Sequence, residues 1–251
     1  MIRAVLFDIG STLWSSPAED PDGLLTVYNR GRDALLEAIP DVPAVEVLIE
    51  AVEGYLAEWE EIWRTDPAQV MQRPTPEFVA DALARLKLEA PDHIIERFTA
   101  EVMEASVYTA RAEDEEDGMA DALDDLNAME VRLACVSNAF MGFETLERIL
   151  DAKGLGKHLE FVISSADTGI RKPHEAIYLA AATRLGLAPE EIVYVGDRVS
   201  ADVEGPAAIG MRGILTHQYR QEDPASGSVA PVAVIQHLRE LSGVIRWLNG
   251  D

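Results

Sequence analysis

The sequence predicts an α/β fold: a doubly wound parallel sheet that carries an inserted, all-helical domain. Short runs rich in Ile, Val and Leu recur along the second half of the chain, and helix-like stretches separate them. Near-continuous apolar strands of this kind are typical of parallel sheets covered on both faces. Between residues 15 and 110 this alternation stops, and long segments with helical periodicity replace it. Together these observations indicate a sheet domain that is interrupted by helices.

The sheet domain is expected to contain five clear strands and a mixed C-terminal segment. The strands are expected at Arg3–Phe7, Val131–Val136, Glu160–Ile163, Ile192–Val195 and Gly213–Thr216. The helices between them are expected at Gly118–Ala128, Phe143–Ala152, His174–Leu185 and Ala201–Ile209. From Val232 onward we expect a last short strand or turn and then a helix over Ile235–Leu248. Ligands in such folds bind beyond the carboxyl ends of the strands.

The inserted domain is expected over residues 15–110, which leaves residues 1–14 and 111–251 for the sheet domain. Its helices are expected at Leu24–Ala38, Ala44–Thr65, Thr75–Leu86 and Asp92–Ser106. In the second of them Tyr55, Trp59 and Trp63 form a stripe at helical spacing, which favours packing within the insertion over a cofactor site. One of these rings could still face the active site. The acidic run from Glu113 to Asp117 lacks the ligand pattern of a calcium loop and predicts a solvated hinge.

The charge of the chain limits its partners. It has 45 acidic and 21 basic residues among 251, a formal net charge of −24. Such a chain repels nucleic acid and anionic membrane surfaces, so we expect neither as a partner. It would also repel a phosphorylated substrate unless a cation sits in the site, which is a first indication of a divalent metal. We expect a monomer or a homodimer.

Two further features indicate a cytoplasmic protein. No apolar run approaches the roughly 20 residues that a membrane span needs, and the N-terminus runs directly into a strand, unlike a signal peptide. The one cysteine, Cys135, lies inside an apolar run. It predicts a small buried side chain, in keeping with a reducing compartment.

Two candidate site segments follow the first two expected strands. Asp8 ends the first strand and meets a tight turn, where a carboxylate either caps the turn or acts as a nucleophile that forms a covalent intermediate. Ser137 and Asn138 follow the second strand. They either cap the next helix or, with nearby backbone N–H groups, hold a phosphoryl oxygen.

Two more candidate segments follow later strands. Lys172 lies in a loop before Pro173, where it is either solvated or neutralises a nucleophile and a phosphate. Asp197 and Asp202 follow the strand Ile192–Val195. Two carboxylates this close either share a cation or leave one of them protonated. Oxygen ligands of this kind suit magnesium, Mg²⁺.

These features, in this order, resemble the four motifs of the haloacid dehalogenase superfamily. The segment Asp8–Thr12 resembles the motif hhhDxDGT, and Ser137 and Lys172 match the second and third motifs. The fourth motif, GDxxxxD, is matched by Gly196, Asp197 and Asp202. The resemblance covers the whole chain, because the insertion falls where the family's C1-type helical cap sits. It implies a Rossmann-like core and a cap that excludes water and selects the leaving group.

The resemblance implies a Mg²⁺-dependent phosphatase that acts on a small phosphorylated metabolite. Asp8 would be the nucleophile, and water would hydrolyse the aspartyl-phosphate that forms on it. Mg²⁺ and Lys172 would offset the charge of the transition state. The implied metal ligands are Asp8, the backbone carbonyl of Gly10, Asp197 and Asp202, which binds through water or orients Lys172. The implied substrate-binding residues are Ser137 and Asn138, with Thr12 supporting the first loop.

Gly10 departs from the family pattern. The family's phosphatases usually carry a second Asp at this position, as general acid and base, and glycine cannot move a proton. Such catalysis contributes about 10²–10⁴ in rate. We therefore expect slow hydrolysis of esters with poor leaving groups, unless another group replaces the Asp. A substrate with a good leaving group, such as a sugar 1-phosphate or an acyl phosphate, would suit this site.

Two alternative functions stay open. The 2-haloacid dehalogenases also lack the second Asp and attack carbon without a metal, but their fourth motif typically reads SSN, whereas this chain has Gly196-Asp197-Arg198. A non-catalytic binding protein of the same fold is the second alternative. The loss of the acid/base at Gly10 is its only support, and a pure scaffold would not need Asp8, Ser137, Lys172, Asp197 and Asp202.

Overall fold

The computed structural model describes residues 1–15, 21–66, 68–105, 107 and 118–250. The chain forms two compact units. Unit one comprises Met1–Ser16 and Asp114–Asp251, and unit two comprises Pro17–Glu113. The chain therefore leaves unit one after a single strand and returns to it after unit two. The acidic segment Glu113–Asp117, expected to be a solvated hinge, lies outside the described residues.

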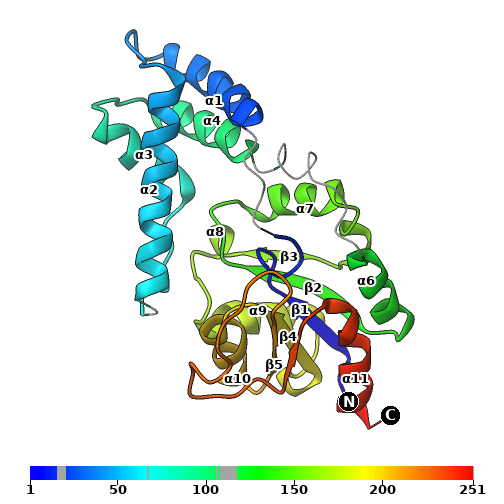
Figure 1. Ribbon diagram of the computed structural model, residues 1–251. Helices are drawn as coiled ribbons and strands as arrows, with labels where there is room; N and C mark the ends of the chain where they lie inside the picture. The colour runs from blue at the N-terminus through cyan, green and yellow to red at the C-terminus, as the bar shows by residue number, and fades with distance from the viewer. Residues whose placement is uncertain (16–20, 67, 106, 108–117, 251) are drawn as a thin grey trace. The chain divides into compact units, whose positions relative to one another are not determined.

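Unit one is built on a six-stranded parallel sheet with the strand order β3-β2-β1-β4-β5-β6 (Figure 1). The first strand of the chain is central, and the strand order runs outward from it in both directions. The doubly wound α/β prediction is therefore confirmed. The strands are β1 (Ala4–Phe7), β2 (Arg132–Ser137), β3 (Val162–Ser164), β4 (Ile192–Gly196), β5 (Arg212–Thr216) and β6 (Ala233–Ile235).

The central strands are buried on both faces. Ala4 and Leu6 of β1 belong to a core cluster with Ala134 of β2, Tyr194 of β4 and Ile177 of a covering helix. Val5 and Phe7 are fully buried as well, and because side chains alternate along a strand they face the opposite layer. This double burial explains why the strands read as continuous apolar runs in the sequence.

Helices cover the sheet on both sides (Figure 1). One layer contains α9 and α10, which contact each other, and the other contains α6 and α11, which also contact each other. The helices of unit one are α6 (Met119–Ala128), α7 (Phe143–Ala152), α8 (Ser165–Thr168), α9 (Glu175–Leu185), α10 (Gly205–Ala207) and α11 (Leu241–Asn249). Short 3₁₀ turns lie at Gly156–His158, Pro189–Glu191 and Leu238–Glu240.

Two of the expected helices were wrong in form. The segment Ala201–Ile209 is not one α-helix but a π-helical turn, Val199–Glu204, followed by the short α10. Pro206 has no backbone N–H to continue a helix, and a π-turn is frequent at functional sites. The C-terminal helix begins at Leu241 instead of Ile235, because Ile235 ends the edge strand β6 and its carbonyl accepts the N–H of His217 at 2.8 Å.

Unit two is helical throughout its described secondary structure. α1 packs against α4, and α2 packs against α3. The expected aromatic stripe lies inside this unit, where the rings of Trp59 and Trp63 contact each other and both contact Phe78, with centroids 5.2–5.6 Å apart. The helices are α1 (Pro21–Leu36, three residues earlier than expected), α2 (Val45–Thr65), α3 (Thr75–Arg85) and α4 (Asp92–Met103).

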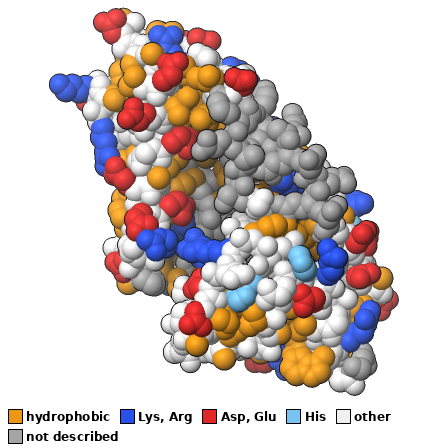
Figure 2. Space-filling model, in the orientation of Figure 1, with side chains coloured by type: hydrophobic (Ala, Val, Ile, Leu, Met, Phe, Trp, Pro, Cys, Tyr) orange, Lys and Arg blue, Asp and Glu red, His pale blue; other side chains and the backbone are white. Residues whose placement is uncertain are grey.

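The acidic surface is partly neutralised by local ion pairs. On the face that Figure 2 draws, acidic and basic side chains are interspersed and form no single block. In unit two, Arg85 contacts Glu58 and Arg97 contacts Glu37, each pair with N···O distances of 2.7 Å. Exposed pairs of this kind contribute little to stability, because water and salt screen them. Separately, among the described helices none has the length and apolar character needed to cross a membrane.

Substitution of Gly213 should destabilise unit one. A Cβ at this position in β5 would lie 2.6 Å from the Cα of Val203 and 2.9 Å from the carbonyl oxygen of Asp202, both rigid backbone atoms. Overpacking of this kind costs about 1–3 kcal/mol, so Gly213→Ala should lower the melting temperature by several degrees. Gly243→Ala in α11 is the control, because its Cβ meets nothing within 4 Å. A Gly213→Ala protein that melts at the wild-type temperature would contradict this packing.

Candidate active site

The candidate site residues meet at the carboxyl edge of the sheet. Phe7 pairs with Cys135 of β2 and with Val195 of β4, so the residues that follow these strands emerge side by side. Asp8 follows β1, and its N–H donates to the carbonyl of Val195 at 2.9 Å. One carboxylate oxygen each of Asp8, Asp197 and Asp202 lies within 4.8 Å of the others.

Lys172 lies at the centre of this group. Its Nζ is 2.8 Å from Oδ1 of Asp8, 2.8 Å from Oδ1 of Asp202 and 2.8 Å from Oη of Tyr194. An ammonium group has three N–H donors, and here each has an acceptor. Burial alone would lower the pKa of Lys172, but Asp202 and Asp8 outweigh burial and raise it. The lysine therefore stays charged inside the protein, with its side chain 2% exposed.

Asn138 holds the loop that carries Lys172. Its Oδ1 accepts the backbone N–H of Lys172 at 2.8 Å, and its Nδ2 donates to the carbonyl of Lys172 at 3.0 Å. The described contacts of the Asn138 side chain are therefore to the lysine backbone, and the expected contact with substrate stays a prediction. Ser137, the last residue of β2, is buried and pairs with Ser164 of β3 in the register of the sheet.

The turn after Asp8 is short and tightly bonded. The N–H groups of Thr12 and Leu13 both donate to the carbonyl of Ile9, at 3.2 and 2.8 Å. Thr12 is fully buried, and its hydroxyl has no partner among the described residues. Gly10 is exposed, and a Cβ built on it would meet nothing within 4 Å. The position of the missing acid/base therefore has room for a side chain.

Asp202 is held from two sides. Oδ1 binds Lys172, and Oδ2 accepts the backbone N–H of Arg198 at 2.9 Å. The carboxylate approaches Gly196 so closely that a Cβ there would lie 2.2 Å from Cγ of Asp202. This contact explains the glycine before Asp197, because any other residue would displace the carboxylate. Asp202 thus orients Lys172.

Asp197 is buried in an excess of negative charge. Burial raises its pKa to about 7, and the nearby carboxylates of Asp8 and Asp202 add to the shift. Burial, together with Asp8, also raises the pKa of Asp202. Asp197 has one polar contact with a side chain, from Nη1 of Arg220 to Oδ2 at 3.4 Å. Arg198 and Arg220 lower the pKa of Asp197, but burial and the two neighbouring carboxylates outweigh them.

A divalent cation fits this donor set. Asp8 uses Oδ1, and Asp197 uses Oδ2, in contacts with described side chains, which leaves one carboxylate oxygen on each for a metal. Hard oxygen donors and excess negative charge are what Mg²⁺ requires. Both oxygens of Asp202 are already engaged, by Lys172 and Arg198. Asp8 and Asp197 are therefore the better direct ligands.

The structure adds two residues that the sequence did not single out. Tyr194 lies inside the apolar run of β4, where its ring fits the core pattern and nothing signals a polar contact with Lys172. Arg220 comes from the loop after β5, which has no motif. Cys135, by contrast, is buried and free as expected, and burial raises the pKa of its thiol.

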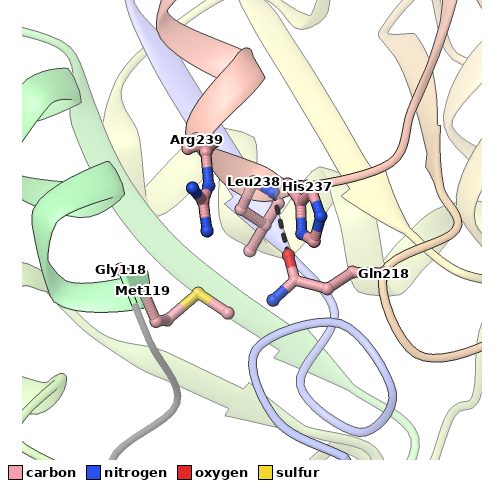
Figure 3. A pocket seen from close by; sticks show the side chains of 6 residues that line it. All are labelled: Gly118, Met119, Gln218, His237, Leu238 and Arg239. Carbon is pink, nitrogen blue, oxygen red and sulfur yellow. Dashed lines mark hydrogen bonds between the residues drawn. The ribbon is translucent and has the colours of Figure 1, made fainter.

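A small pocket in unit one is separate from this carboxylate group. In Figure 3, Gln218 reaches toward the turn that begins α11, and its Oε1 accepts the N–H of Leu238 at 2.9 Å. The pocket is lined by Gly118, Met119, Gln218, His237, Leu238 and Arg239. None of the acids or Lys172 is among these residues, so the pocket does not mark the chemical site.

Comparison with known proteins decides the family. Residues 2–210 match the haloacid dehalogenase-like hydrolases. The chain belongs to this family. The resemblance seen in its four motifs is thereby confirmed.

Similar enzymes include named phosphatases. The glyceraldehyde 3-phosphate phosphatase of Methanopyrus kandleri is 34% identical over 130 residues, which cover 50% of this chain and 54% of that enzyme. The phosphoglycolate phosphatase of Salmonella choleraesuis is 26% identical over 221 residues, which cover 87% of this chain and 82% of that enzyme. The chain spans about half the length of several relatives that it matches, the Methanopyrus enzyme among them.

A solved structure shares the fold. The 2-haloacid dehalogenase from Pseudomonas syringae pv. tomato DC3000 superposes with a TM-score of 0.63 at 24% identity, covering 98% of this chain and 100% of that chain. At this identity the likeness shows the fold alone. The choice between phosphate and haloacid chemistry therefore has to come from the site residues.

Removal of the Asp197 carboxylate should stabilise the metal-free protein. The folded pKa of about 7 lies above the ordinary value of 3.8, so the folded state binds more protons between these values and loses stability as pH rises. In EDTA, Asp197→Asn should raise the melting temperature more at pH 8 than at pH 5, by roughly 2–4 °C for each kcal/mol of repulsion relieved. Asp125→Asn, at an exposed position in α6, is the control. Equal gains at both pH values would contradict the charge excess.

Proposed function

We propose that this hydrolase is a Mg²⁺-dependent phosphoric monoester phosphatase that acts on a small phosphorylated metabolite, with Asp8 as the nucleophile. The observation that carries the proposal is the buried Lys172, which bridges Asp8 and Asp202 beside the buried carboxylate of Asp197. A buried group of three acids and one lysine suits an anionic substrate that arrives with a cation. The phosphatase names of two similar enzymes support the same choice.

In the proposed reaction Oδ1 of Asp8, which leaves Oδ2 for the metal, attacks phosphorus, and the bond from phosphorus to the ester oxygen breaks. The leaving group departs with the bonding electrons, and an aspartyl-phosphate remains on Asp8. Water then attacks this phosphorus, which releases inorganic phosphate and restores the carboxylate. Lys172 stays charged throughout and offsets the negative charge on the phosphoryl oxygens. The hydroxyl of Ser137 would donate to one of those oxygens.

The proposed metal ligands are Asp8, the carbonyl of Gly10 and Asp197, with Asp202 acting through water. When bound, Mg²⁺ would supply the positive charge that this site lacks. Asp8 and Asp197 would each contribute the oxygen that no described side chain contacts. The same proposal assigns the helical unit two, expected over residues 15–110, as the cap that selects the leaving group. The buried unpaired Cys135 is the ground on which we propose a cytoplasmic location.

Asp8→Asn should abolish metal-dependent hydrolysis of p-nitrophenyl phosphate. Loss of the nucleophile should reduce kcat by about 10³-fold or more, and EDTA should have the same effect on the wild type. Asp125→Asn serves as the matched control, because it removes an exposed carboxylate from the same unit. Halide release from 2-haloacids in EDTA would instead establish a dehalogenase. Absence of both activities would point to the binding protein.

Gly10→Asp should speed the hydrolysis of esters with poor leaving groups. The new side chain has open space, and a carboxyl group there can donate a proton to the departing oxygen. On an alkyl phosphate we expect kcat to rise about ten-fold or more, within the 10²–10⁴ that such catalysis can contribute, and to rise much less on p-nitrophenyl phosphate. Gly10→Asn has the same size and cannot transfer the proton. An equal gain in Gly10→Asn would exclude acid catalysis as the cause.

A further inference from the structure

Tyr194 makes two short hydrogen bonds with groups from different parts of the site. Its hydroxyl donates to the carbonyl of Val136 at 2.6 Å, and it accepts from Nζ of Lys172 at 2.8 Å. Both bonds are buried, and the Tyr194 side chain is fully enclosed. Because the one hydroxyl proton points at Val136, the lone pairs of the oxygen face the lysine. The phenol is therefore fixed as an acceptor for Lys172.

This arrangement links two of the site's segments. Val136 directly precedes Ser137 at the end of β2, and Lys172 lies in the loop before α9. Tyr194 itself comes from β4, two residues before Gly196. One hydroxyl thus sets the distance between the lysine and the strand end that carries the serine. Lysine has a long flexible stem, so its charged end needs fixed partners to stay in one place.

The two other acceptors of Lys172 are Asp8 and Asp202, and only Asp8 changes chemically during the proposed reaction. Asp8 is consumed when it attacks phosphorus, so its hold on the ammonium changes with each turnover. Asp202 and Tyr194 take no part in bond formation and keep their contacts. We infer that Tyr194 is a positioning residue, which holds the ammonium of Lys172 in place through its hydroxyl while the negative charge of Asp8 passes to the departing oxygen. This inference rests on the proposed phosphatase function.

A neighbouring tyrosine offers a matched control. The ring of Tyr178 meets that of Tyr194 edge-on with centroids 5.4 Å apart, and both side chains are fully buried. The hydroxyl of Tyr178 also donates to a backbone carbonyl, that of Ala201, but it makes no hydrogen bond with Lys172. Phenylalanine at either position removes one buried hydroxyl from the same core. Only Tyr194→Phe removes an acceptor of the lysine.

The kinetic test compares these two variants on p-nitrophenyl phosphate with Mg²⁺. We expect Tyr194→Phe to lower kcat by about ten-fold with KM changed less than about two-fold, because the lost contact concerns the transition state. Tyr178→Phe should lower the melting temperature by a similar amount and kcat by less than about two-fold. A Tyr194→Phe enzyme with wild-type kcat, or equal kcat losses in both variants, would overturn the inference.

A second test does not depend on turnover. In a double-mutant cycle, Tyr194→Phe should lower the melting temperature by at least about 2 °C less in a Lys172→Met protein than in the wild type, whereas Tyr178→Phe should cost the same in both. Lys172→Gln replaces Lys172→Met if the latter does not fold. Additive effects of the Tyr194 and Lys172 changes would overturn the inference. A wild type without phosphatase activity would overturn the proposed function, while this cycle would still decide whether the hydroxyl and the ammonium are coupled.

Discussion

The ammonium of Lys172, buried among Asp8, Asp202 and Tyr194, is the interaction on which the rest of the site depends. A buried charge is tolerated only when all its hydrogen bonds are met, and removal of one partner from such a group costs more than the pair contributes. Three strands must therefore end at the same level for the site to exist. The parallel register of β1, β2 and β4 provides that alignment, and Asn138 fixes the lysine backbone against it.

The same group shows how function and stability compete in this chain. Asp197 is buried, and its carboxylate repels those of Asp8 and Asp202 when no cation is bound. A core built for stability alone would replace it with a neutral side chain. Natural proteins keep such destabilising groups at functional sites, and stabilising interactions elsewhere in the structure offset them. Gly196 is a second example, because only a residue without a Cβ lets the carboxylate of Asp202 lie so close to the strand end.

Much of this structure follows from local patterns, and the rest depends on contacts between distant residues. Double burial makes the strands apolar, and strand ends expose the residues after them, so Asp8 and Asp197 can be predicted from their places after β1 and β4. Tyr194 cannot, because its partners are 22 and 58 residues away and its ring alone fits a core position. The prediction of a single helix before β5 fails for the opposite reason. Pro206 is visible in the sequence, although the stretch Ala201–Ile209 reads as one helix.

The central position of β1 has a consequence for folding. β1 is synthesised before the other strands of the sheet, and its neighbours β2 and β4 come more than a hundred residues later. The N–H of Arg3, for example, donates to the carbonyl of Glu191, which is synthesised much later. Pairings this distant in sequence form slowly. Unit two ends at Glu113, so all of it is synthesised before β2 and β4. During translation the strand that carries Asp8 therefore emerges with an apolar, unpaired edge, which stays unpaired until β2 and β4 have been made.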